Sequence, residues 1–110
     1  MPDGQHIEFN EEELRQKINL ETGKLGWDEL ARPFAQGIVV VISPGLDLID
    51  TAVKFCADDK PQIETWANAG LIYRPMDEDA RRWHQQGSQF WSTVVAPWVL
   101  VQEITPKLDS

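Results

Sequence analysis

Residues 90–103 have the sequence Phe90-Trp91-Ser92-Thr93-Val94-Val95-Ala96-Pro97-Trp98-Val99-Leu100-Val101-Gln102-Glu103, which is apolar at both odd and even positions. Side chains alternate between the two faces of a β-strand, so a strand built from this stretch is apolar on both faces. Such a strand belongs in the middle of a small domain or beneath a partner's surface, because otherwise two Trp side chains would stand in water. Pro97 cannot donate a backbone hydrogen bond, which predicts a bulge, a bend or an unpaired edge position there.

The composition predicts one folded, aromatic-rich domain. The chain has 110 residues, of which 42% are hydrophobic and five are Trp. This is enough hydrophobic material to form a single core without stabilisation by disulfides or a metal ion. The formal charge is −8, from 18 acidic and 10 basic residues. This acidity disfavours contact with nucleic acid or with an anionic membrane, since both carry negative charge.

The chain is expected to be cytoplasmic. Its one cysteine, Cys56, cannot form an internal disulfide, which favours a reducing compartment. Residues 1–10 have neither the basic start nor the apolar run of a signal peptide, and no segment has about 18 consecutive apolar residues. Neither secretion nor membrane insertion is therefore expected.

Local signals predict an alternation of helices and strands within a domain spanning residues 10–105. Residues 1–9 are expected to be a mobile arm and residues 106–110 a tail. Residues 88–92 fit either helix or strand. The other predicted elements are a helix over 11–22 capped by Asn10, with Leu14, Ile18 and Leu25 on its buried side; a helix over 28–36 containing Pro33; a strand over 38–42; helices over 46–57 and 61–69; a strand over 71–74; a helix over 77–86 capped by Asp77; and a strand from 94 onward.

These elements predict an α+β fold with a small mixed or antiparallel sheet of about three strands and four to five helices. Their order from residue 28 to residue 103 matches that of winged-helix domains, which is an analogy of fold and not of function. The helix that would read DNA, residues 61–68, contains no Lys or Arg, and the segment in place of the wing opens with Asp77, Glu78 and Asp79. Recognition of DNA needs basic side chains at these places, so binding to nucleic acid is not expected.

The stretch from residue 94 to residue 103 also carries a family resemblance. Together with Asn19-Leu20-Glu21-Thr22, Trp27-Asp28-Glu29-Leu30 and Phe34-Ala35-Gln36-Gly37, it resembles a family of small uncharacterised bacterial proteins, a domain of unknown function. The resemblance covers about residues 14–103. It implies a family and supplies no catalytic or binding residues.

Few side chains are candidates for chemistry. Cys56 and His84 are the one plausible nucleophile and base, but their spacing does not make them neighbours. The simpler interpretation places Cys56 in the core and His84 against Trp83. Arg81 and Arg82 either hold an anion or pair with nearby acidic side chains. Two His and one Cys are too few for a metal site, and the glycines form no nucleotide-binding motif. The paired acids are interpreted as capping and turn residues, namely Asp47, Asp50, Asp58 and Asp59. No cofactor and no metal are expected.

The aromatic cluster offers the main functional clue. Trp83, Phe90, Trp91 and Trp98 are expected in the core, but an exposed Trp91 or Trp98 would mark an interaction surface. The favoured hypothesis is a non-enzymatic interaction module that self-associates or binds a protein through apolar surface near the C-terminal strand. The alternative is a small ligand-binding protein or enzyme with a pocket beside the last helix, using His84, Cys56 and Arg81 or Arg82.

Overall fold

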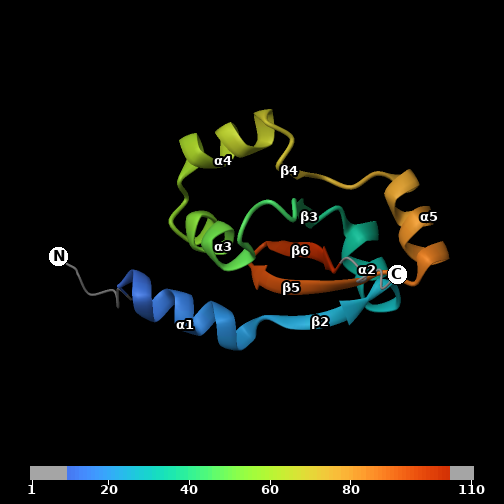
Figure 1. Ribbon diagram of the computed structural model, residues 1–110, viewed down its shortest axis with the longest axis horizontal. Helices are drawn as coiled ribbons and strands as arrows, with labels where there is room; N and C mark the ends of the chain where they lie inside the picture. Colours follow the sequence, from blue (N-terminus) through green and yellow to red (C-terminus); the bar gives the residue numbers. More distant parts are fainter. Residues whose placement is uncertain (1–9, 105–110) are drawn as a thin grey trace, which may run out of the picture.

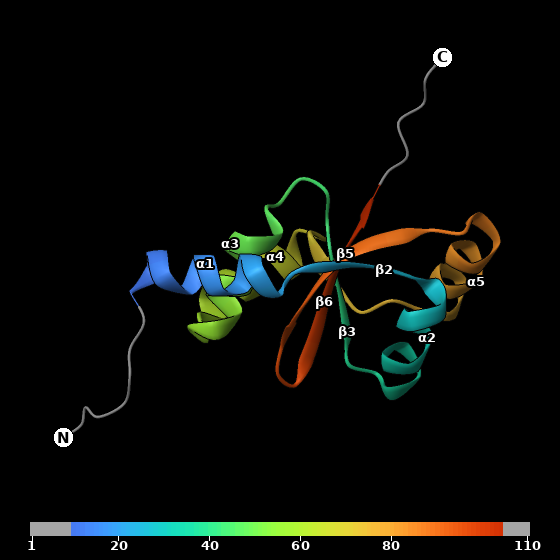
Figure 2. The same cartoon turned by 90° about the horizontal axis from the view of Figure 1, so that it is seen from below.

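The computed structural model describes residues 10–104, which form one mixed five-stranded sheet with helices on both of its faces (Figures 1 and 2). The strand order is β2-β5-β6-β3-β4. β3 runs parallel to β6, and the other neighbours are antiparallel. The elements in chain order are α1 (Glu11–Glu21), β2 (Gly23–Gly26), α2 (Trp27–Gln36), β3 (Val39–Ile42), α3 (Leu48–Cys56), α4 (Lys60–Asn68), β4 (Ile72–Tyr73), α5 (Asp77–Gln86), β5 (Gln89–Val95) and β6 (Trp98–Ile104). The predicted arm, residues 1–9, and the predicted tail, residues 106–110, lie outside the described residues.

Local capping signals placed most helix ends correctly. Asn10 caps α1 as predicted, because its side chain accepts from the backbone N–H of Glu13 at 2.8 Å. Asp47 caps α3 and Asp59 caps α4 in the same way. Gly37 ends α2 with a φ of 76°, a left-handed conformation that glycine adopts without steric cost.

The predicted cap of α5 is wrong by one residue. Met76 occupies the cap position, and its backbone N–H donates to the carboxylate of Asp79 at 2.9 Å. The acid that accepts this hydrogen bond therefore lies in the first turn of the helix, and its side chain reaches back to the cap residue. Asp77 is the first residue of α5.

The stretch from residue 90 to residue 103 is a hairpin and not one strand. β5 and β6 pair in register from Gln89 opposite Ile104 to Val95 opposite Trp98, and the turn contains a cis peptide bond between Ala96 and Pro97. The bend expected at Pro97 is present, whereas the helical alternative for residues 88–92 is wrong. β2 pairs with the outer side of β5, and β3 pairs with the outer side of β6, so both arms of the hairpin are central strands.

The sheet has five strands where about three were expected. The α+β class is confirmed, as is the number of helices. The additional edge strand is β2, whose Gly-Lys-Leu-Gly sequence is too short to show an alternating pattern. Leu25 lies in this strand, opposite Phe90, and not on the buried side of α1.

Two hydrophobic cores lie on opposite faces of the sheet. Val40 and Ile42 of β3 point into one core, which α1, α3 and α4 cover. Val39 and Val41 point into the other, which α2 and α5 cover and which contains Trp83. Both faces of β3 are therefore buried, as the run of five β-branched residues predicted.

Replacing Thr93 by Val is expected to raise the free energy of unfolding by about 1 kcal/mol, because the change removes a buried hydroxyl without removing a hydrogen bond. Thr93 is 1% exposed, and its hydroxyl has no hydrogen-bond partner among the described residues. Thr51→Val is the matched control, since Thr51 is equally buried but donates to the Asp47 carbonyl at 2.8 Å. Urea denaturation measures both variants, and a Thr93→Val protein no more stable than wild type contradicts the prediction.

Candidate functional site

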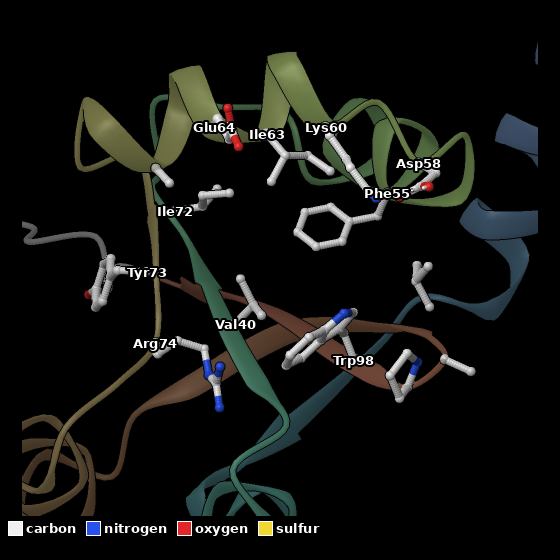
Figure 3. A pocket seen from close by; sticks show the side chains of 14 residues that line it. Val40, Phe55, Asp58, Lys60, Ile63, Glu64, Ile72, Tyr73, Arg74 and Trp98 are labelled. Atoms are coloured by element: carbon white, nitrogen blue, oxygen red, sulfur yellow. Dashed lines mark ion pairs between the residues drawn. The ribbon is translucent and has the colours of Figure 1, made fainter.

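A groove of about 520 Å³ lies between α4 and the turn of the β5–β6 hairpin (Figure 3). Phe55 and Ile63 approach it from the helical side, and Trp98 and Val40 from the sheet. Its volume is within the range of binding pockets, which are mostly apolar with a few polar groups. Its apolar lining consists of Val40, Phe55, Ile63, Ala67, Ile72, Val95, Ala96, Pro97 and Trp98.

The groove exists because α4 covers the sheet incompletely. The helix has no fully buried residue, and only Ile63 and Trp66 of its side chains pack against the core. Trp98, the first residue of β6, is half-buried and projects toward the same space from below. An aromatic ring thus remains partly in water next to apolar neighbours, which is typical of interaction sites.

Charged side chains stand on two sides of the groove. The guanidinium carbon of Arg74 lies 5.0 Å from the centroid of the Trp98 ring, and the guanidinium also donates to the Gly37 carbonyl. On the α4 side stand Glu64 and a weak pair in which the Lys60 ammonium is 4.0 Å from the Asp58 carboxylate. The groove therefore combines an apolar floor with a charged rim.

The predicted nucleophile and base are far apart. Cys56 ends α3, and His84 lies on α5 at the other end of the molecule (Figure 1). Cys56 is exposed, so its predicted place in the core is wrong, because the last residue of α3 lies beyond the part of the helix that packs on the sheet. Partial burial still raises the pKa of the Cys56 thiol, which keeps the thiol protonated at neutral pH.

His84, which the simpler interpretation placed against Trp83, is exposed and lines two depressions together with Trp27. The larger of these, of about 530 Å³, is also lined by Asp28, Glu29 and Ser88. Arg81 lies on the other side of His84, in a second depression next to Trp27. The structure thus brings His84 and Arg81 together and leaves Cys56 out.

The remaining polar candidates have structural partners. Arg82 pairs with Asp79 at 3.2 Å, as one of the two interpretations predicted, and its other nitrogen is 3.9 Å from Glu103. Asp50 pairs with Arg15 of α1. Within residues 10–104, no three His, Cys, Asp or Glu side chains gather where they could hold a metal ion.

The aromatic cluster divides between core and surface. Trp83 and Phe90 are fully buried with their ring centroids 4.9 Å apart, as expected. Trp91 is 42% exposed and carries the Lys24 ammonium 5.4 Å above its ring, so its placement in the core is wrong. It lies next to the edge strand β2, where less of the sheet is covered.

Sequence reasoning missed two polar residues that organise the fold. The Gln102 amide donates to the carbonyls of Ser43 at 2.9 Å and Leu46 at 2.7 Å, which fixes the loop before α3. The Glu103 carboxylate accepts from the Trp83 indole at 3.3 Å and from the Ser88 hydroxyl at 2.9 Å. The sequence signal that could have identified them is the presence of two long polar side chains in a strand that is otherwise apolar. No signal identified Arg74 or the α4 side of the groove.

Fold and groove together define a small α+β domain with an apolar surface groove beside a central hairpin. The chain belongs to the family described as "Protein of unknown function (DUF2288)", whose model matches residues 13–103. The solved NMR structure of PA1075 from Pseudomonas aeruginosa is similar, with a TM-score of 0.75 and 29% sequence identity over 97% of this chain and 99% of that one. The family predicted from the C-terminal stretch is thereby confirmed. A comparison with curated proteins found no match. Of the helices described, none is both long and apolar enough to cross a membrane.

Proposed function

We propose that this protein is a non-catalytic interaction module that binds a segment of a partner protein in the groove between α4 and the hairpin turn. The observation that carries the proposal is the half-buried Trp98, which projects into an apolar groove of about 520 Å³. The cytoplasm is the proposed compartment, consistent with the single thiol.

The composition of the groove favours a protein as the occupant. Trp, Tyr and Arg are the residues that most often dominate the energy of protein interfaces, and all three border this groove as Trp98, Tyr73 and Arg74. An apolar centre with a charged rim is also the usual anatomy of such interfaces. Binding a partner segment would remove the exposed part of the Trp98 ring from water.

A second candidate is a ligand-binding protein or enzyme that uses the depression beside His84. This candidate is favoured because His84, Asp28 and Glu29 line the depression. However, the one cysteine is remote, and the hydroxyl of Ser88, which also lines the depression, donates to the Glu103 carboxylate at 2.9 Å. Nucleic-acid binding has less support, because α4, where the winged-helix analogy would place the reading helix, has Lys60 as its one basic residue.

The test is selection of random displayed peptides on the wild-type protein, followed by affinity measurements on two variants. Ala67 lies on α4 in the groove lining, so Ala67→Trp is expected to fill the groove and weaken the selected peptides by about tenfold or more, a loss of about 1.4 kcal/mol. Ala35→Trp is the matched control, because Ala35 is an exposed alanine on α2. Equal affinities for both variants, with both folded by thermal denaturation, would refute the proposed function.

A further inference from the structure

We infer that the partner segment carries a carboxylate next to the apolar side chain that enters the groove, and that Arg74 binds this carboxylate. The inference rests on the proposed function, which it deepens by assigning a chemistry to the partner. The observation behind it is a positioned guanidinium, without an acidic partner among the described residues, at the edge of an apolar groove.

Arg74 is held in place by two contacts that leave most of its donors free. The Trp98 ring lies against the guanidinium at 5.0 Å, and the Gly37 carbonyl accepts from one of its terminal nitrogens. A guanidinium has five N–H donors, so several remain for a ligand. Because the side chain is already ordered, binding an anion costs less conformational entropy than it would for a free arginine.

No carboxylate within residues 10–104 forms an ion pair with Arg74. In a chain whose acidic residues number 18 against 10 basic ones, Arg15 pairs with Glu11 and with Asp50, and Arg82 pairs with Asp79. Arg32 and Arg81 also form no ion pair within these residues, but neither of them lines the groove. Against that excess of acid, an exposed arginine beside an apolar groove is a site for an external carboxylate, which guanidinium binds in a two-pronged geometry.

The charges of the groove also give the segment a direction. The α4 side carries Glu64 and Asp58 against Lys60, a net charge of −1, while Arg74 stands on the side of the sheet (Figure 3). An acidic residue is repelled by the first side and attracted by the second. The carboxylate is therefore expected to lie next to Arg74 with the apolar side chain between Ile63 and Trp98.

A partner protein fits better than a second copy of this chain. Each copy has a formal charge of −8, so two copies repel each other. A second copy nevertheless has exposed apolar residues that are followed by an acid, namely Leu20 before Glu21 in α1 and Met76 before Asp77 at the start of α5, and the test must separate this occupant.

The experiment is a focused peptide library with a fixed apolar centre and Asp, Glu, Ser or Lys at the flanking positions, selected on wild type, Arg74→Gln and Arg74→Glu. Wild type is expected to select Asp or Glu, and the affinity of those peptides is expected to fall about tenfold on Arg74→Gln, as for a charge-assisted hydrogen bond. Arg74→Glu is expected to select Lys instead. Arg81→Glu is the control, because it makes the same change of charge at an exposed site away from the groove.

The outcomes separate this inference from the proposed function. Peptides that Ala67→Trp weakens but that show no preference at the flanks, or the same preference on Arg74→Glu, overturn the inference and leave the groove as a binding site. Failure to select any peptide that Ala67→Trp weakens overturns both. A dimer of the wild-type protein in sedimentation equilibrium, absent in Ala67→Trp, would identify a second copy as the occupant and also overturn the inference. Decanoate is a fatty acid with an apolar chain and a carboxylate. If it binds in the groove and excludes the selected peptides at equal concentration, a fatty acid is the occupant and the inference is also overturned.

Discussion

Replacing Trp83 by Ala is expected to lower the free energy of unfolding by about 3–5 kcal/mol, the largest effect of any single change considered. Trp83 is fully buried in the core between α2, α5 and the sheet. Its ring packs edge-on against Phe90, with centroids 4.9 Å apart, and lies 6.1 Å from the centroid of Trp27. The truncation would leave a cavity that two aromatic neighbours on different elements cannot close.

Trp91→Ala is the matched control for this prediction. Trp91 lies on β5, is 42% exposed, and makes one cation–π contact with Lys24. Its loss is expected to cost about 1–2 kcal/mol, because about half of its apolar area already lies in water. Urea denaturation followed by circular dichroism measures both variants. Similar losses for Trp83→Ala and Trp91→Ala would contradict the division of the tryptophans between core and surface.

Glu103→Leu is expected to lower the free energy of unfolding by about 2–3 kcal/mol, although the new side chain is apolar and similar in size. The carboxylate accepts from the Trp83 indole at 3.3 Å and from the Ser88 hydroxyl at 2.9 Å. Trp83 is fully buried, so its indole N–H would lose its acceptor without gaining water. The cost comes from the two donors that remain, not from the acid that is lost.

Two variants separate this cause from a general effect of removing charge. Glu103→Gln keeps one carbonyl oxygen as an acceptor and is expected to lose less than half as much stability as Glu103→Leu. Glu78→Leu removes an acid from the exposed first turn of α5 and is expected to change stability by about 0.5 kcal/mol, since it disturbs only the helix dipole. The explanation is wrong if Glu103→Gln and Glu103→Leu are equally unstable in urea denaturation.

The helices were predictable because their signals are local. Asn10 and Asp47 accept hydrogen bonds from residues three positions ahead, so the cap and its helix lie in the same short window of sequence. Pro33 lies inside α2, and the helix reaches Gln36 as predicted. Met76 was missed as the cap of α5, and Asp77 was predicted in its place, because three acids follow Met76 and each is a plausible partner for the free N–H groups.

The candidate site was largely unpredictable because no local pattern records which segments meet. The groove joins α4 to the hairpin turn, and these lie about thirty residues apart in the chain. Apolar surface near the C-terminal strand was expected, and Trp98 was one of its named residues. Arg74 carried no signal, since its role depends on the ring of Trp98 beside it.

The sequence by itself determined the α+β class, the capped helices, the doubly buried strand β3 and the family, because each depends on a short run of side chains with a fixed period or on a continuous motif. Only the tertiary structure decided that residues 90–103 form a hairpin, that Trp91 is exposed while Trp83 is buried, and that a groove remains beside Trp98. These outcomes depend on how completely distant helices cover each face of the sheet. How completely a helix covers the sheet depends on the packing of several elements against one another, so the sequence pattern of a single element does not predict it.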